Sequence, residues 1–389
     1  MGNTCLTLKP GGVGKKNGWV RLNWSLEGFI EESFVLSHEL SEPDSHFLGD
    51  TERGDHALVA VLLLAMQQNK NIIVRGKVSP RLLDGLETLQ VIWNRWRPYR
   101  YKIISIKVDE ESEAVPAEQN SSAIFAFSGG VDASFSLFRH LKGQAGRNTY
   151  RPGAAIMVHG MDIPLNLEDF YYNATIKTKR MLKGTGVPLI QVRTNSRFLR
   201  QNWEDSYGLQ LAACFLLLQE NFFKAVKGSG EPYEALVFPW GSTPLTDSLC
   251  STDAMQFEHD GCGFDRTEKI GWLVKNTNAT SELRVCWAGQ ELDKNCGECE
   301  KCVRTMLNFW ALGLPVPEAF PVFLDPKRVK SIKIKNVVQK NEISTLYKHA
   351  VENHAKNDPI LKAVGHVIGE AGSKALFKKF VNASRQLIK

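Results

Sequence analysis

The sequence predicts an α/β fold built on a doubly wound parallel sheet, with a small mixed α/β region before it and a basic helical region after it. Three observations lead to this prediction. Short apolar runs alternate with helical stretches after residue 122, a Ser-Gly-Gly turn follows the first of these runs, and four cysteines gather within residues 286–302. Alternating strands and helices are typical of a parallel sheet covered on both faces, with its site at the carboxyl ends of the strands.

Residues 1–118 are expected to form a separate accessory domain. Strand-like runs occur at 19–26, 71–75 and 101–108, and helical patterns occur at 55–67 and 80–95. Residues 109–122 contain five Asp or Glu and one Pro, which is typical of a polar linker.

Residues 119–324 are expected to form the main domain, and the strand after the linker opens it. Strands are predicted at 123–127, 154–158, 189–193 and 235–238, separated by helices such as 132–141 and 169–182. The loop at 240–247 follows the last of these strands, and its Asp247 either accepts a hydrogen bond from an exocyclic amine of a substrate or caps the loop. The charged residues between His259 and Glu268 form either a lid or a solvated loop.

Residues 325–389 form the third predicted region, which is helical with a break at 357–359. They contain 14 Lys or Arg against 5 Asp or Glu, so residues 1–324 contain 34 against 37 and the net charge of +6 originates in this region. A solvated helical face explains such a region, and docking of an acidic protein or a nucleic acid is the alternative.

The composition indicates a cytoplasmic globular protein with no membrane association. Hydrophobic residues make up 43% of the 389 residues, an ordinary content for a packed core. The longest apolar stretch, residues 57–66, is about half of what a membrane-spanning helix needs, and the N-terminus lacks the apolar core of a signal peptide. Eight cysteines are too few for a disulfide scaffold in a chain of this length, so metal ligation in a reducing compartment is expected.

The turn at 128–132, Ser-Gly-Gly-Val-Asp, is predicted to cradle an anion. Gly129 and Gly130 let the backbone approach a phosphate, Ser128 adds a hydroxyl, and the unpaired amides of a helix beginning near Asp132 point at the charge. No Gly-Lys-Ser or Gly-Lys-Thr follows, so the turn is not a Walker A loop. An ordinary strand-to-helix turn is the alternative.

The four clustered cysteines are predicted to bind one zinc ion. Cys286, Cys296, Cys299 and Cys302 have the spacing Cys-x9-Cys-x2-Cys-x2-Cys, in which short loops bring four thiolates to a tetrahedral ion. Closed sites of this kind are usually structural. An iron–sulfur cluster is the alternative.

The stretch from Ser128 to Ser134 resembles the PP-loop of the ATP pyrophosphatase superfamily, whose signature is Ser-Gly-Gly-x-Asp-Ser. Members of this superfamily cleave ATP between the α and β phosphates and retain pyrophosphate in the loop. Ala133 stands where the signature has Ser, and Ser134 follows one place later. The resemblance implies ATP and Mg²⁺ as cofactors, with Ser134 supplying the missing hydroxyl from the first helical turn.

The same resemblance assigns roles to individual residues. Adenine would bind where the second strand ends, although His159 there is equally explained as a satisfied surface imidazole. The implied nucleotide-binding residues are Ser128, Gly129, Gly130, Val131, Asp132, Val158, His159 and Gly160. The implied catalytic residues are Ser128, Asp132 and Ser134, with Asp132 holding magnesium or orienting the loop.

The loop and the cysteines together, in this order, resemble the 7-cyano-7-deazaguanine synthase family. Residues 296–304, Cys-Gly-Glu-Cys-Glu-Lys-Cys-Val-Arg, are similar to the Cys-Gly-x-Cys-x-x-Cys-x-x-Arg knuckle of that family, and residues 265–270 are similar to its Arg-x-Glu segment, which adds Arg266 to the implied catalytic residues. The resemblance covers about residues 122–310, so the N-terminal and C-terminal regions are additions.

The family resemblance implies a C–N bond-forming ligase that uses ATP to activate the carboxylate of 7-carboxy-7-deazaguanine, as in queuosine biosynthesis. Ammonia then attacks the acyl adenylate to give an amide, and a second ATP-driven step gives the nitrile. The two additional regions suggest a larger amine acceptor, on a protein or a nucleic acid, and assembly as a homodimer is left open. Enlarged relatives occur in bacterial defence gene sets, which suggests an antiviral role by analogy only.

Two other hypotheses remain. A different PP-loop enzyme, such as a tRNA-modifying thiolase or ligase, would normally need paired reactive cysteines near the loop, whereas Cys5, Cys214, Cys250 and Cys262 are scattered. A nucleotide-binding adaptor without turnover is suggested by Ala133.

Overall fold

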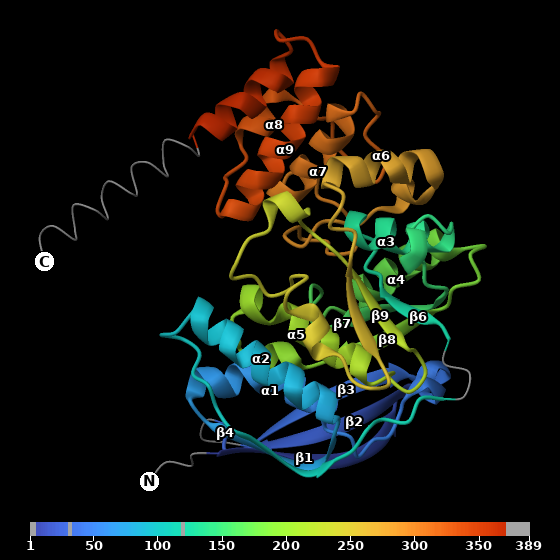
Figure 1. The fold of residues 1–389 in the computed structure, drawn as a ribbon. Helices are drawn as coiled ribbons and strands as arrows, with labels where there is room; N and C mark the ends of the chain where they lie inside the picture. The colour runs from blue at the N-terminus through green and yellow to red at the C-terminus, as the bar shows by residue number, and fades with distance from the viewer. Residues whose placement is uncertain (1–4, 30–32, 118–120, 371–389) are drawn as a thin grey trace, which may run out of the picture. The chain divides into compact units, whose positions relative to one another are not determined.

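The computed structural model describes residues 5–29, 33–117 and 121–370, which Figure 1 traces in colour. The chain divides into two compact units, each assembled from separate stretches. Unit 1 comprises Met1–Ser128, Ser136–Ser229 and Phe238–Asp260, and unit 2 comprises Gly129–Phe135, Gly230–Val237 and Gly261–Lys389. This grouping differs from the predicted segments 1–118, 119–324 and 325–389, because both units draw on the middle of the chain.

Unit 1 is α/β and is built on a sheet that has ten strands within the described residues, in the order β10-β9-β6-β7-β8-β3-β2-β1-β4-β5. Six of the neighbouring pairs are parallel and three are antiparallel, so the sheet is mostly parallel, as predicted. The strands are β1 (Cys5–Lys16), β2 (Trp19–Glu27), β3 (Phe34–Ser41), β4 (Asn71–Val78), β5 (Ile106–Glu111), β6 (Ala123–Ala126), β7 (Pro152–His159), β8 (Leu189–Thr194), β9 (Lys224–Gly228) and β10 (Gln256–Asp260).

The N-terminal strands do not form a sheet of their own. β3 pairs antiparallel with β8, with Leu40 opposite Val192 and His38 opposite Thr194, and this pairing joins β1–β5 to β6–β10. An unpaired edge would leave a row of backbone donors and acceptors open, and the β3–β8 pairing removes one such edge from each half. Strands β1–β5 therefore extend the sheet formed by β6–β10.

Helices lie on both faces of the sheet around β6, β7 and β8 (Figure 1). Ile124 of β6 belongs to a core shared with α1 (Asp55–Gln68), α2 (Pro80–Trp96) and α5 (Trp203–Leu216). The next residue, Phe125, points to the other face, where its ring lies 5.1 Å from that of His140 in α3 (Val131–Leu141). On that face Tyr171 of α4 (Glu168–Leu182) donates a hydrogen bond to the carbonyl of Met157 in β7.

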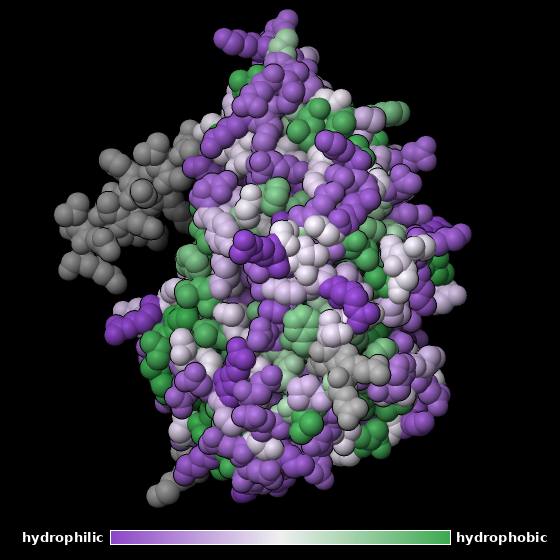
Figure 2. Space-filling view, turned by 45° about the vertical axis from the view of Figure 1, so that its right-hand side comes forward, coloured by the Kyte–Doolittle hydropathy of each residue, from purple (hydrophilic) through white to green (hydrophobic). Residues whose placement is uncertain are grey.

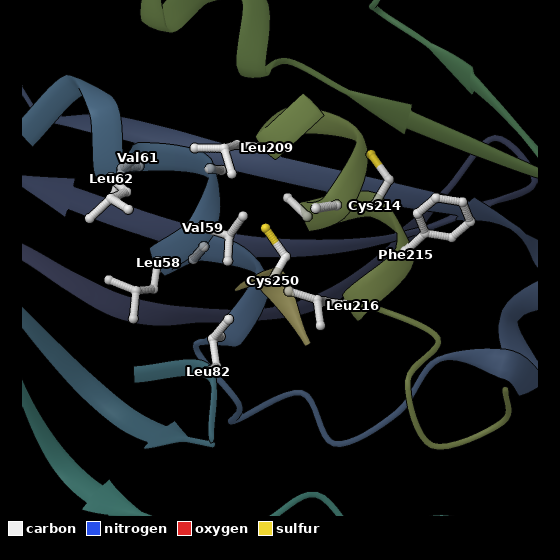
Figure 3. Packing of buried hydrophobic residues seen from close by; sticks show 14 of the residues in the cluster. Leu58, Val59, Val61, Leu62, Leu82, Leu209, Cys214, Phe215, Leu216 and Cys250 are labelled. Carbon is white, nitrogen blue, oxygen red and sulfur yellow. The ribbon is translucent and has the colours of Figure 1, made fainter. Parts of the chain in front are cut away.

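The core between α1 and α5 is dense and apolar, as Figure 3 shows for Leu58, Val59, Leu209 and Phe215. α1 is buried along nearly its whole length, which explains its unbroken apolar run. Figure 2 shows hydrophilic residues over most of the visible face of the molecule, with hydrophobic residues in small groups between them. Within the described ranges, no helix is both long and apolar enough to cross a membrane.

Unit 2 is mostly helical after residue 261. α6 (Arg266–Asn276), α7 (Glu300–Ala311) and α9 (Val337–Asn353) pack on one another, and α8 (Pro326–Lys330) lies between α7 and α9 in the chain. Residues 359–370 are also helical, and the break before them, at residues 354–358, overlaps the predicted break at 357–359. Residues 371–389, the end of the predicted basic region, lie outside the described residues.

Short 3₁₀ turns connect these elements. They are η1 (Glu42–Phe47), η2 (Gly146–Asn148), η3 (Ser196–Leu199), η4 (Tyr233–Ala235), η5 (Asp247–Cys250) and η6 (Ala279–Glu282).

One sequence-based strand prediction was wrong, and another was correct only in its last residues. Residues 235–238 are not a strand: they begin at the end of η4, and the fourth strand of the parallel group is β9, which begins eleven residues earlier. The predicted strand at 101–108 begins only at Ile106, because the backbone amides before it have partners outside the sheet. The amide of Tyr101 donates to the carbonyl of Arg97 at 3.0 Å, and the amide of Ile104 donates to the side chain of Gln90 at 2.9 Å.

The charged segment between His259 and Glu268 is neither a lid nor a solvated loop. His259 and Asp260 end β10, and Asp265 caps α6. The Asp265 side chain accepts from the amide of Glu268, and the Glu268 side chain accepts from the amide of Asp265. This reciprocal pair explains the charge pattern as a helix start.

Two histidines are buried in the core of unit 1. The rings of His38 in β3 and His56 in α1 lie 5.2 Å apart, edge to face, and Trp24 lies against His56. Neither ring nitrogen of His38 has a hydrogen-bond partner among the described residues. Burial lowers the pKa of His38 to about 4, and it lowers the pKa of His56 well below its ordinary value of 6.5.

We expect the free energy of unfolding to decrease as the pH falls from 6.5 towards about 4. In that range the unfolded chain binds protons on these imidazoles that the folded chain does not bind, so stability is greatest above pH 6.5 and is lost below it. Urea unfolding near pH 7.5 and near pH 5 measures the change. His38→Leu should reduce the pH dependence, whereas the exposed-site control His366→Leu should not; an unchanged dependence in His38→Leu would contradict the assignment.

Candidate functional site

The predicted anion loop lies between β6 and α3. β6 ends at Ala126 and α3 begins at Val131, so the turn is short. Gly129 has φ +78, a left-handed conformation that favours glycine. The carbonyl of Gly129 accepts from the amide of Arg284 at 2.9 Å, and the carbonyl of Gly130 accepts from the amide of Ser134 at 3.0 Å, which fixes the turn and the start of the helix.

The amide groups of this turn are open. In the part of the chain that the structure describes, those of residues 129–133 donate to no protein acceptor. First-turn amides have no partner within their own helix, and they carry part of the positive end of the helix dipole. The turn therefore has the chemistry that binds phosphate or another anion.

The strand order places the start of this turn at a branching point of the parallel strands in unit 1. From β6 the chain continues to β7 and β8 on one side of the sheet, and later to β9 and β10 on the other. Ligands of open α/β sheets bind at the carboxyl ends of the strands where the order reverses in this way. Ser128, two residues after the end of β6, stands at this point.

Asp132, in the first turn of α3, is paired with two cations of α6. Its Oδ2 accepts from Arg266 at 2.6 Å, and its Oδ1 lies 3.5 Å from the Lys269 ammonium. Burial alone would raise the pKa of Asp132, but the charges of Arg266 and Lys269 outweigh it and lower the pKa. The carboxylate is therefore ionised, and the structure brings together two of the predicted catalytic residues, Asp132 and Arg266.

Ser134, the other predicted catalytic residue of this helix, is fully buried. Its hydroxyl has no hydrogen-bond partner among the described residues. Ala133, which takes the place of the signature serine, is half-buried.

The pair extends into a network of alternating charges in unit 2. Arg266 also binds Glu342 of α9 at 2.7 Å, Glu342 binds Arg304 of α7, and Arg304 donates to Glu300 at 2.6 Å. The Arg266, Arg304 and Glu342 side chains are at most 11% exposed. Burying ions costs free energy unless they are paired, so this network fixes the first turn of α3 against α6, α7 and α9.

Sequence reasoning missed Lys269 and Glu342 as members of this network. Lys269 falls inside the Arg-x-Glu segment but reads as a helix-surface residue, although it is 1% exposed. Glu342 lies 76 residues after Arg266, and its contact with Arg266 depends on the packing of α9. Arg304, which closes the knuckle motif, was the available signal that the cysteines and the loop belong together.

The four cysteines gather as the spacing predicts. Their sulfur atoms all lie within 4.8 Å of one another, and the hydrogen-bonded pairs are 3.6, 3.7 and 3.9 Å apart. A tetrahedral ion with bonds of about 2.3 Å to sulfur requires sulfur–sulfur edges of about 3.8 Å. Cys286, Cys296, Cys299 and Cys302 could therefore bind one metal ion such as zinc.

The backbone around the cysteines supports such a site. The amide of Cys299 donates to the sulfur of Cys296 at 3.2 Å, and the amide of Cys302 donates to the sulfur of Cys299 at 3.4 Å. Gly297 has φ +72, and a Cβ there would lie 2.3 Å from Val322. An iron–sulfur cluster places iron and sulfide between its thiolates and holds them further apart, so the short sulfur distances favour a single ion.

At residues 158–160, where adenine was predicted to bind, His159 is not the surface imidazole that the sequence allowed. His159 is completely buried, its ring stacks on Tyr171 at 4.3 Å, and its Nε2 donates to the carbonyl of Pro164 at 2.9 Å. Burial lowers the pKa of His159. Gly160 has φ +96, and a Cβ there would lie 2.0 Å from the carbonyl oxygen of Thr194. The His159 side chain packs α4 on the sheet, and a contact to adenine from Val158, His159 or Gly160 remains a prediction for the backbone.

Comparisons of this chain with models of protein families, with curated proteins and with solved structures find no match.

We expect the purified protein to contain about one zinc ion per chain, bound by the four thiolates. Metal analysis and the visible absorbance spectrum measure this. Cys302→Ser should release the ion, and the control Cys5→Ser, whose thiol lies in β1, should retain it. A coloured protein with inorganic sulfide, or wild-type protein that binds no zinc after reconstitution, would contradict the assignment.

We expect Glu342→Ala to lower the free energy of unfolding by about 3–5 kcal/mol, because Arg266 and Arg304 would lose the carboxylate between them. The matched control is Glu352→Ala, at an exposed position of the same helix, which should change stability by less than about 0.5 kcal/mol. Urea unfolding at neutral pH measures both. Equal changes in the free energy of unfolding for the two substitutions would show that the charge network does not stabilise the fold.

Proposed function

We propose that this protein is an ATP-dependent ligase that adenylates the carboxylate of 7-carboxy-7-deazaguanine, releases pyrophosphate and transfers the acyl group to an amine. The observation that carries this proposal is the turn at residues 128–133, in which a left-handed glycine and open first-turn amides follow a strand at the branching point of the parallel group. The resemblance of this turn to a PP-loop supports ATP as the nucleotide. The resemblance of the cysteine knuckle to that of the 7-cyano-7-deazaguanine synthase family supports the deazaguanine acid as the substrate.

The open amides would hold the β and γ phosphates of ATP, with Ser128 adding a hydroxyl. When the substrate carboxylate attacks the α phosphate, negative charge moves onto the departing pyrophosphate, and fixed amides aimed at it stabilise that charge. Both carboxylate oxygens of Asp132 already face cations, so Asp132 orients the loop through Arg266 and Lys269. Magnesium would then be held mainly by the phosphates, where it neutralises their charge.

The metal centre has a structural role in this proposal. Zinc would hold residues 286–302 together where α7 begins, and Cys299 already caps that helix by accepting from the amide of Cys302. Arg304, in the first turns of the same helix, reaches Glu342 and through it Arg266. The ion would therefore position the Arg266–Asp132 pair without contacting the substrate.

The amine acceptor is ammonia or an amino group of a macromolecule, and product analysis separates the two. Ammonia gives the amide and then 7-cyano-7-deazaguanine. A macromolecular acceptor becomes heavier by one deazaguanine acyl group and remains unchanged in mass if the proposal of a large acceptor is wrong.

The thiolase alternative has less support. Cys214 and Cys250 lie in the apolar core, as Figure 3 shows, and burial raises the pKa of Cys214 to about 12 and that of Cys250 further. Neither is an accessible thiolate at neutral pH. The adaptor alternative rests on Ala133 and on the buried hydroxyl of Ser134, and it predicts nucleotide binding without turnover.

Mass spectrometry of the products tests the proposal after incubation with ATP, magnesium, ammonium and 7-carboxy-7-deazaguanine. We expect AMP and pyrophosphate only when the acid is present. Asp132→Asn should reduce AMP formation by roughly 10²-fold or more, because the loop loses its link to Arg266 and Lys269. The matched control, Asp169→Asn, makes the same change in the first turn of α4 and should retain activity. Formation of ADP, or of AMP without the acid, would contradict the proposal.

A further inference from the structure

A second cluster of polar side chains lies at the carboxyl ends of β9 and β10 in unit 1. Lys227 and His259 are in register on these parallel neighbours, so both side chains point to the same face of the sheet. On that face the preceding pair, Ala225 and Phe257, is apolar and belongs to the core. The strands therefore change from apolar to charged where they end.

The cluster is centred on one carboxylate oxygen. Asp247 Oδ2 accepts from Ser242 at 2.6 Å and from His259 Nδ1 at 2.7 Å, and it lies 3.8 Å from the Lys227 ammonium. Lys227 also donates to the Ser242 hydroxyl. Burial alone would raise the pKa of Asp247, but Lys227 and the two hydrogen bonds outweigh it, so the pKa is lowered and the group is an ionised acceptor.

Part of the cluster is left for a ligand. All hydrogen bonds that Asp247 accepts from the described residues go to Oδ2, which leaves Oδ1 as a free acceptor. The ammonium of Lys227 has three donors, and its side chain is 19% exposed, compared with 4% for His259. Ser242 and His259 therefore hold Asp247 and Lys227 in place, and the latter two can receive a molecule from solvent.

Two aromatic side chains, Tyr207 and Trp240, form an aromatic wall beside these groups. Two glycines let α5 contact the 240–247 loop directly: a Cβ on Gly208 would lie 2.1 Å from the carbonyl oxygen of Gly241. This contact places the ring of Tyr207 5.1 Å from the Lys227 ammonium, and Trp240 lies 6.3 Å from Tyr207. A planar ring is the ligand that such a wall favours.

The position in the sheet supports a binding role over a purely structural one. β9 is the neighbour of β6, and the register of Phe125 with Val226 places Lys227 one residue further along, level with Ala126. The cluster thus lies at the same edge of the sheet as Ser128, where open α/β sheets bind ligands. Three charged or titratable groups removed from water at a strand end cost stability, which a structural contact between apolar side chains would avoid.

We propose that Lys227, Asp247 and Tyr207 form the binding site for a planar nitrogen heterocycle that carries a carboxylate. The ammonium of Lys227 binds the carboxylate, Asp247 Oδ1 accepts from a ring N–H or an exocyclic amine, and the ring lies against Tyr207. This inference rests on the proposed function, which supplies 7-carboxy-7-deazaguanine as the heterocycle, and it assigns the residues that recognise it.

Calorimetric titration with two probes, 7-carboxy-7-deazaguanine and 7-deazaguanine without the carboxylate, tests the site. Lys227→Met should weaken binding of the acid at least 10-fold and leave the affinity for the second probe unchanged. Asp247→Asn should weaken both. The matched control is Lys224→Met, which removes another lysine of β9 that lies over a tyrosine ring, Tyr150 at 4.8 Å, on the opposite face of the sheet; it should leave both affinities unchanged.

The outcomes separate this inference from the proposed function. If the wild type forms AMP with the acid and Lys227→Met binds both probes as the wild type does, the inference is wrong and the proposed function stands. If the wild type forms no AMP but binds the acid in a Lys227-dependent manner, the proposed function is wrong and the site stands. If the wild type binds neither probe, the inference is wrong.

Discussion

The antiparallel pairing of β3 with β8 is the constraint on which unit 1 depends. Without it, β1–β5 and β6–β10 would be two smaller sheets with open edges, and α1 would have no common core with α5. With it, Leu40 and Val192 join one apolar layer. Because β6 lies inside this continuous sheet, with β7 and β9 on either side, the strand that leads to the anion loop is held on both edges. A strand that is fixed on both edges gives the loop after it a fixed starting position, which a preorganised anion-binding site requires.

The parts of this structure that depend on local sequence were predictable. Each of these parts is specified by a pattern within about 20 neighbouring residues. They are the apolar runs that form β2, β4, β6, β7 and β8, the turn at Gly129 and the cysteine knuckle. β9 and β10 were missed because Lys224, Lys227, Glu258 and His259 interrupt their apolar pattern, and these charges have partners only in the folded sheet. β1 was missed because Pro10 and two glycines sit at its bulge. The pairing of β3 with β8, and of Glu342 with Arg266, joins residues far apart in the chain, and no local pattern reports it.

The charge network of unit 2 connects the start of α3, the helix that follows the four-cysteine cluster and the C-terminal helix α9. Asp132 needs a nearby cation to remain ionised where it is removed from water, and Arg266 supplies it. Glu342 and Arg304 in turn keep Arg266 from being an unpaired buried charge. Arg304 lies two residues after Cys302, the last cysteine of the knuckle. The region after residue 325, which sequence alone presents as a solvated basic tail, thus contributes a carboxylate to the centre of the unit.

The most direct test of the central claim is isotope exchange between pyrophosphate and ATP in the absence of any amine. Reversible adenylation of a carboxylate returns labelled pyrophosphate to ATP, whereas transfer of the γ-phosphoryl group does not. We predict that label enters ATP when 7-carboxy-7-deazaguanine and magnesium are present, and that it stops when the acid is omitted. No exchange with the acid present, in protein shown to bind ATP, would contradict the account and would leave a loop that binds nucleotide without activating a carboxylate.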